Sequence, residues 1–141
     1  MGWKLAISIV VVIVVWLGAD LLVHHVLLGN EYEKDEHAKL MRPPKQINHT
    51  AYYVAVAASA LCFVGIYALL AQPRTVAKGL MYGFLFGVAV GVPMAYGTFA
   101  YMKISHMMAL GWLGGSLLRC VVGGLVVGLV LKSCPKTAET A

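Results

Sequence analysis

Four long apolar runs alternate with shorter polar segments along the chain. The runs cover residues 5–28, 51–71, 79–101 and 107–131. A bilayer core about 30 Å thick is crossed by about 20 apolar helical residues, so each run is long enough to span it. The pattern predicts an all-α fold, an integral membrane four-helix bundle that forms one domain over residues 1–141. A long polar loop, residues 29–50, is expected between helices 1 and 2.

The composition favours a protein of the membrane over one of the aqueous phase. Of the 141 residues, 60% are hydrophobic and 12% are charged. In soluble domains about half of the residues are hydrophobic and about a quarter are charged. The net charge of +5 does not indicate nucleic-acid binding, because the basic residues lie at the ends of the apolar runs rather than in one patch. The lipid bilayer is therefore the expected partner, and we exclude nucleic acid.

Glycine recurs at four-residue spacing in the last two runs. The positions are Gly79, Gly83, Gly87 and Gly91 in the third run and Gly111, Gly115 and Gly123 in the fourth. Residues four apart share a helix face, and stripes of small residues let helices approach closely in lipid. We predict that the third and fourth helices form a tightly packed hairpin, with a kink at Pro93.

Asp20 and Arg119 are charged residues inside the apolar runs. Arg119 takes a glycine position in the stripe of the fourth helix, so it is expected to point into the bundle, where a charge needs a partner. Asp20 is the only acidic residue within a run, and His24 shares its helix face. We interpret Asp20, His24 and Arg119 as an intramembrane polar cluster that clasps helices 1 and 4 together. A proton relay or an anion site is the alternative.

Histidine and methionine gather at the end of the predicted bundle that carries the 29–50 loop. His24, His25, His106 and Met102 are candidate metal ligands there, because imidazole with thioether suits copper and imidazole alone suits haem iron. Asp20 would then orient His24 as a second-shell carboxylate. Interfacial, hydrogen-bonded histidines are the competing interpretation, since no HExxH, CxxCH or MxxxM pattern occurs.

No catalytic residues are predicted. The sequence has no nucleophile–base arrangement, no pair of catalytic carboxylates and no phosphate-binding loop. Cys62, Cys120 and Cys134 lack CxxC spacing and are interpreted as small packing residues. Nothing in the chain therefore requires an enzyme.

The segments ADLLVHHVLLGNEY, MRPP and GLMYGFLFG are similar to those of a family of small bacterial four-helix integral membrane proteins of unknown function. The resemblance covers essentially the whole chain. It implies the four-helix topology and carries over no activity, cofactor or site residue.

The leading functional hypothesis is a non-catalytic accessory or structural subunit of a larger bacterial membrane complex. It rests on the small size, the lack of catalytic groups and the close-packing glycine faces, and the expected partners are other membrane subunits or further copies of the chain. Two alternatives stay open: a haem- or copper-binding membrane protein, and a small oligomeric transporter with a path lined by Asp20, His24 and Arg119. We expect the bacterial inner membrane as the location, with both termini in the cytoplasm.

Overall fold

The computed structural model describes residues 2–34 and 39–132, and the regular structure in these residues is entirely helical. Two π-helices and one 3₁₀ helix, labelled η, stand among the α-helices. In chain order the elements are α1 (Gly2–Leu21), η1 (Leu22–Leu27), α2 (Gly29–Tyr32), η2 (Pro44–Gln46), α4 (His49–Leu70), α5 (Val76–Val92), η3 (Pro93–Gly97), α6 (Thr98–Tyr101) and α7 (His106–Val130).

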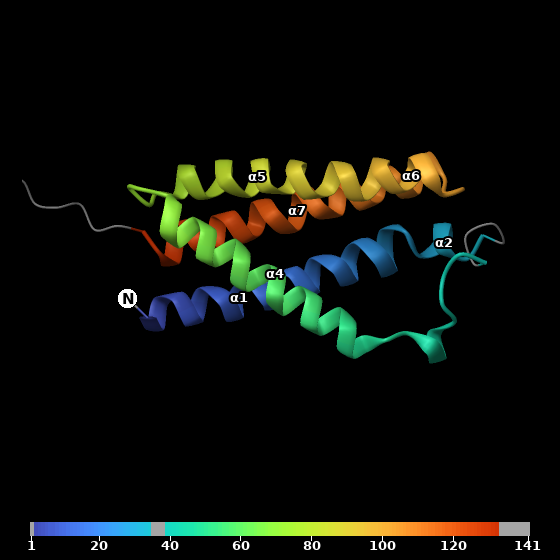
Figure 1. Cartoon of the computed structure of the whole chain (residues 1–141), viewed down its shortest axis with the longest axis horizontal. Helices are drawn as coiled ribbons and strands as arrows, with labels where there is room; N and C mark the ends of the chain where they lie inside the picture. The colour runs from blue at the N-terminus through green and yellow to red at the C-terminus, as the bar shows by residue number, and fades with distance from the viewer. Residues whose placement is uncertain (1, 35–38, 133–141) are drawn as a thin grey trace, which may run out of the picture.

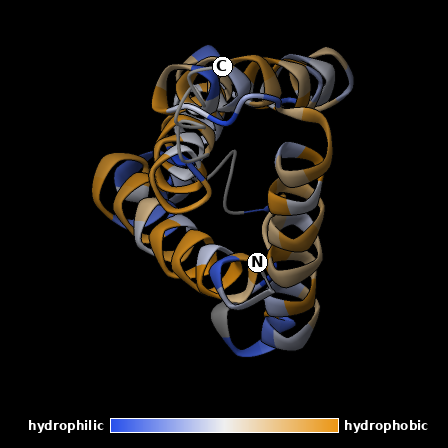
Figure 2. Ribbon diagram, turned by 90° about the vertical axis from the view of Figure 1, so that its left-hand side faces the viewer, coloured by the Kyte–Doolittle hydropathy of each residue, from blue (hydrophilic) through white to orange (hydrophobic). Residues whose placement is uncertain are grey.

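Four helices are long and apolar enough to cross a membrane. They are Gly2–Leu27, His49–Leu70, Val76–Tyr101 and His106–Val130. The prediction of an all-α fold with four such helices is confirmed, and each boundary lies within three residues of its predicted place. The segment between the first two spans is not an uninterrupted loop, because α2 and η2 lie within it. The long helices are coloured mostly as hydrophobic when the bundle is seen end-on (Figure 2).

Helices α5 and α7 form the closest pair, and they run side by side along the molecule (Figure 1). All four glycines of the α5 stripe are buried. A Cβ atom added to Gly79 would lie 2.3 Å from the carbonyl oxygen of Gly124, and one added to Gly83 would lie 2.2 Å from that of Cys120. Side chains larger than hydrogen would therefore collide with backbone, so glycine is what permits this contact.

The glycines Gly111, Gly115 and Gly123 of α7 lie against the first span rather than against α5, although their spacing matches that of the α5 stripe. A Cβ atom added to Gly111 would lie 2.5 Å from Leu28, and one added to Gly115 would lie 2.9 Å from Val23. One added to Gly123 would lie 2.8 Å from Trp16. Successive helical residues point about 100° apart, so α7 presents two small-residue faces to two different neighbours. Gly124 and Gly128 belong to the face that contacts α5 and its preceding turn.

Helix α4 differs between its two halves. Its second half enters the main hydrophobic core, to which it contributes Ala60, Phe63, Val64, Tyr67 and Ala68. Its first half buries only Val56. Figure 1 shows why, because α4 crosses α1 at an angle and its first turns lie away from α5. The bundle is therefore closely packed at the end where α7 ends and more open at the end where α7 begins.

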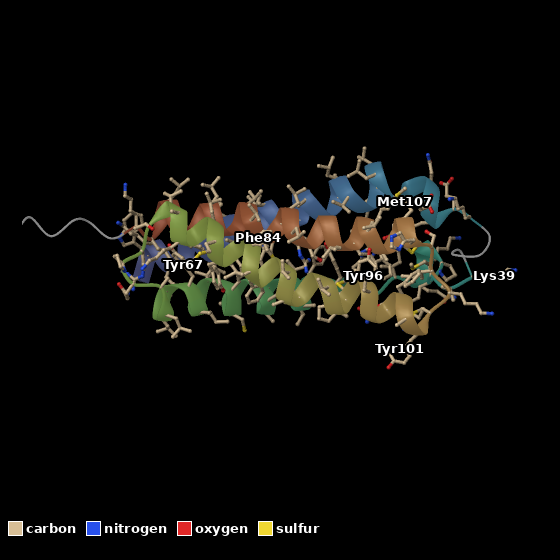
Figure 3. The ribbon with its side chains drawn as sticks, turned by 90° about the horizontal axis from the view of Figure 1, so that it is seen from above. Lys39, Tyr67, Phe84, Tyr96, Tyr101 and Met107 are labelled. Carbon is tan, nitrogen blue, oxygen red and sulfur yellow. The ribbon has the colours of Figure 1, made fainter. Side chains whose placement is uncertain are left out.

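The more open end is held by contacts between α2 and the start of α7. The Ser105 hydroxyl accepts a hydrogen bond from the Met108 backbone N–H at 3.1 Å and so caps α7. The same hydroxyl donates to the Glu31 carboxylate at 3.2 Å. Figure 3 shows Lys39 and Tyr101 at this end, with Tyr101 pointing away from the bundle, and Tyr67 toward the opposite end.

The third span changes its helical form at Pro93. This residue begins the π-helix η3, which connects α5 to α6. Proline has no backbone N–H and cannot complete the α-helical hydrogen-bond pattern, which accounts for the change at this position.

Candidate functional site

The predicted partners Asp20 and Arg119 lie together inside the bundle. Asp20 stands one residue before the end of α1, and Arg119 stands near the middle of α7. Arg119 Nη1 lies 3.5 Å from Asp20 Oδ2, and the two side chains are 23% and 13% exposed, respectively. The geometry is that of a long, partly buried ion pair, because charge-assisted N–H···O bonds are usually shorter than about 2.9 Å.

Tyr52 is a third member of this cluster that the sequence did not reveal. Its hydroxyl donates to Asp20 Oδ2 at 2.8 Å, a shorter contact than the one from Arg119. Tyr52 stands in the first turn of α4, and its hydrogen bond joins that turn to the end of α1. A tyrosine near the end of an apolar run looks like an interfacial aromatic residue, so no local signal distinguishes it.

Arg119 also contacts the side chain of Trp16. Its guanidinium carbon lies 5.3 Å from the centre of the Trp16 ring, a cation–π arrangement. The Trp16 Nε1–H in turn donates to the backbone carbonyl of Arg119 at 2.8 Å. Arg119 Nε is buried, and residues 2–34 and 39–132 offer it no hydrogen-bond partner. The guanidinium therefore has donors to spare.

His24 has its closest polar contact with Tyr32 rather than with the ion pair. Its Nδ1 lies 2.6 Å from the Tyr32 hydroxyl, and Trp112 Nε1–H donates to that same hydroxyl oxygen at 2.7 Å. Burial raises the pKa of Tyr32, against a smaller opposite effect of the Trp112 hydrogen bond. The hydroxyl therefore keeps its proton near neutral pH. With a neutral imidazole it donates to Nδ1, which leaves the His24 proton on Nε2.

His24, Asp20 and Arg119 nevertheless share one small cavity. It measures about 20 Å³, and its wall also includes Trp112 and Ser116 from α7. A space of this size holds about one water molecule. Both π-helices border it, since His24 belongs to η1 and Met94 of η3 completes the wall. Such local widenings of a helix are frequent at functional sites.

Two larger hollows border the cluster. One of about 420 Å³ lies between the end of the first span and the start of α4, and Asp20, His24, His25 and Tyr52 are among its lining residues. The other, of about 320 Å³, lies between α4 and α5 and has Arg119 in its wall. Asp20 thus borders one hollow and Arg119 borders the other.

The remaining candidate metal ligands are dispersed. His25 and Met102 are exposed, and the His106 ring packs 5.7 Å from the rings of both Tyr96 and Phe99. In the described part of the chain, no three His, Cys, Asp or Glu residues are grouped so that they would hold a metal ion. The haem or copper hypothesis gains no support from this geometry.

The fold and the cluster define a small all-helical protein with four candidate membrane spans and an internal Asp–Tyr–Arg group. No protein-family model, curated protein or solved structure matches the chain. The resemblance to small bacterial four-helix membrane proteins therefore stays a prediction.

Proposed function

We propose that the protein is a non-catalytic accessory or structural subunit of a larger bacterial membrane complex. The observation that carries this proposal is the sparsely covered first half of α4, where Val56 is the only buried residue. Two exposed alanines, Ala51 and Ala55, stand one turn apart on one face of that half.

A face of this kind has a physical use in lipid. Helices associate there by close van der Waals packing, because lipid tails are as apolar as leucine and supply no hydrophobic driving force. Small residues on α5 and α7 already serve that purpose within the chain. On the first half of α4, Ala51 and Ala55 are exposed and only Val56 is buried. A transmembrane helix of another subunit would fit against the face that carries these alanines.

The polar cluster supports a structural role in the same complex. Asp20 joins α1 to α7 through Arg119 and α1 to α4 through Tyr52. These bonds fix the direction in which α4 leaves the bundle, and therefore the orientation of its exposed face. Opposite charges in the pair sum to zero, so the cluster needs no further ion to be stable inside a bilayer.

The test is the native mass of the protein extracted from its own membrane into polymer-bounded lipid discs. We expect a species that contains this chain and other membrane subunits at fixed stoichiometry. Ala55→Leu should remove those subunits, because a larger side chain blocks close approach on the α4 face. Ala89→Leu, an exposed alanine on α5, makes the same chemical change elsewhere and should leave the assembly intact.

Three results would count against the proposal. A lone chain with bound lipid would exclude a stable complex. An oligomer of this chain alone would replace the hetero-subunit proposal with self-association. Equal loss of partners with Ala55→Leu and Ala89→Leu would show that the α4 face is not the contact surface.

A further inference from the structure

The hollow between α4 and α5 has the properties of a small-molecule site. Its volume of about 320 Å³ falls within the usual range for ligand pockets, roughly 300–1,000 Å³. Most of its wall is apolar, and aromatic side chains come from α1 and α5. The residues that shape it include Trp16, Ser59, Cys62, Phe86, Val90 and Arg119.

The polar groups of the hollow favour a ligand that accepts hydrogen bonds. A guanidinium carries five N–H donors and no acceptor. Arg119 directs Nη1 to Asp20 at 3.5 Å, and its side chain also lines the hollow. Ser59 of α4 also lines the hollow and carries a hydroxyl. An oxygen atom placed beside Arg119 in the hollow would therefore meet a guanidinium with more N–H groups than its contact with Asp20 uses.

The charge of the site favours a neutral ligand. Asp20 already compensates Arg119 at 3.5 Å. An anionic headgroup beside Arg119 would also lie close to the Asp20 carboxylate, and like charges repel strongly where water is scarce. A carbonyl oxygen accepts hydrogen bonds without adding a charge.

The position of Arg119 requires that the ligand be soluble in lipid. Arg119 stands 13 residues after His106 and 11 residues before Val130. At 1.5 Å per residue it lies about 20 Å from one end of α7 and about 17 Å from the other. The exposed lining residues all belong to α4 and α5, so the hollow opens to the side between these two helices; they are Ala58, Ser59, Cys62 and Val90.

We propose that this hollow binds the headgroup of a neutral, lipid-soluble carbonyl compound of the isoprenoid quinone type. A carbonyl oxygen accepts hydrogen bonds from the Arg119 guanidinium, and the ring packs against Phe86 at the floor of the hollow. The tail leaves between α4 and α5. This site does not depend on the proposed role as a subunit, because every group that forms it belongs to one chain.

Cys62 provides a direct readout of occupancy. It is exposed and lines the hollow, whereas Cys120 is buried. The purified protein in lipid discs would be alkylated with N-ethylmaleimide, and modified Cys62 would be quantified by peptide mass spectrometry. The probe is a benzoquinone with every ring position substituted and an isoprenoid tail, which leaves no position open to thiol addition. The control is an isoprenoid alcohol with the same tail and no ring.

We expect the quinone to slow Cys62 alkylation by about tenfold at a concentration about ten times its dissociation constant. The alcohol should have little effect. Val90→Trp should abolish the protection by filling the hollow. Val88→Trp should retain it, because Val88 is equally exposed at 36% on the same helix and does not line the hollow.

A second variant tests the hydrogen bond from Arg119 to the ligand rather than the volume of the hollow. The double substitution Asp20→Asn with Arg119→Gln removes the guanidinium without leaving a lone charge, and it should weaken protection at least severalfold. Equal protection by the quinone and the alcohol would overturn the proposal, as would stronger protection by oleate, an anionic lipid. Loss of protection in Val88→Trp as well as Val90→Trp would exclude this location. None of these outcomes alters the native mass of the complex, so the two proposals fail separately.

Discussion

Replacement of Gly83 by alanine should strongly destabilise the fold, because the α5–α7 contact at this point is between backbones. The added Cβ would lie 2.2 Å from the Cys120 carbonyl oxygen and 2.9 Å from its carbonyl carbon. Ordinary van der Waals contact begins near 3.4 Å, so the first distance is short by about 1.2 Å. No side-chain rotation relieves this overlap. The two helices must instead move apart by roughly 1 Å.

That separation affects the whole interface. A gap of about 0.5–1 Å already forfeits a quarter to a half of the dispersion energy of each contact. Gly79 and Gly87, one turn away on either side, would lose their close contacts with α7 as well. Overpacking substitutions cost about 1–3 kcal/mol and occasionally more, so we expect about 3 kcal/mol here. This corresponds to roughly a hundredfold change in the unfolding equilibrium constant.

The assay is reversible unfolding in mixed micelles, in which the fraction of sodium dodecyl sulfate is raised and helicity is followed by circular dichroism. Gly114→Ala is the matched control, because a Cβ atom at Gly114 on α7 has nothing within 4 Å. Both variants make the same gain in helix propensity, about 1 kcal/mol in water. If the two variants unfold within about 0.5 kcal/mol of each other, the backbone contact does not carry the stability that the distances imply.

Two other substitutions probe single hydrogen bonds by the same unfolding assay. Tyr52→Phe removes the donor to Asp20 and should lower the free energy of unfolding by about 1.5 kcal/mol, as expected for a hydrogen bond to a charged acceptor. An unchanged unfolding midpoint would mean that the contact adds nothing to stability. Ser105→Ala removes the cap of α7 and should cost about 1 kcal/mol, whereas Ser105→Thr, which retains the hydroxyl, should cost much less. Equal losses in both Ser105 variants would contradict the capping argument.

The helices were predictable from the sequence because hydrophobic length alone specifies them. Each predicted run matches a helix to within three residues. Which helices pack against each other was harder to predict, because four-residue spacing identifies a face of a helix and not the helix that packs against it. Gly123 and Gly124 are adjacent in the sequence, yet one faces Trp16 on α1 and the other faces Gly79 on α5.

The candidate site was predictable only in part. Asp20 and Arg119 stand out because charges in apolar runs need partners, and the structure brings them together. Tyr52 could not be foreseen, because its contact with Asp20 depends on the angle at which α4 crosses α1. His24 shares a helix face with Asp20 as expected, but its hydrogen bond is to Tyr32, which follows it in α2. The spacing of residues within one helix does not predict a contact with the next helix along the chain.

The pairing of Asp20 with Arg119 follows from the way α1 and α7 interlock. On α7, Gly115 contacts Val23, and Gly123 contacts Trp16. Arg119 lies midway between these two glycines, and Asp20 lies between their two partners on the first span, so the antiparallel packing brings the charges together.

A shift of α1 by one helical turn would still place bulky side chains near glycines. It would also put the Asp20 carboxylate opposite a glycine and leave the Arg119 guanidinium unpaired. An isolated charge inside the bundle costs about 3–5 kcal/mol, more than a single glycine contact contributes. Small residues therefore set how closely α1 and α7 approach, and the ion pair selects which of the closely spaced registers the two helices adopt.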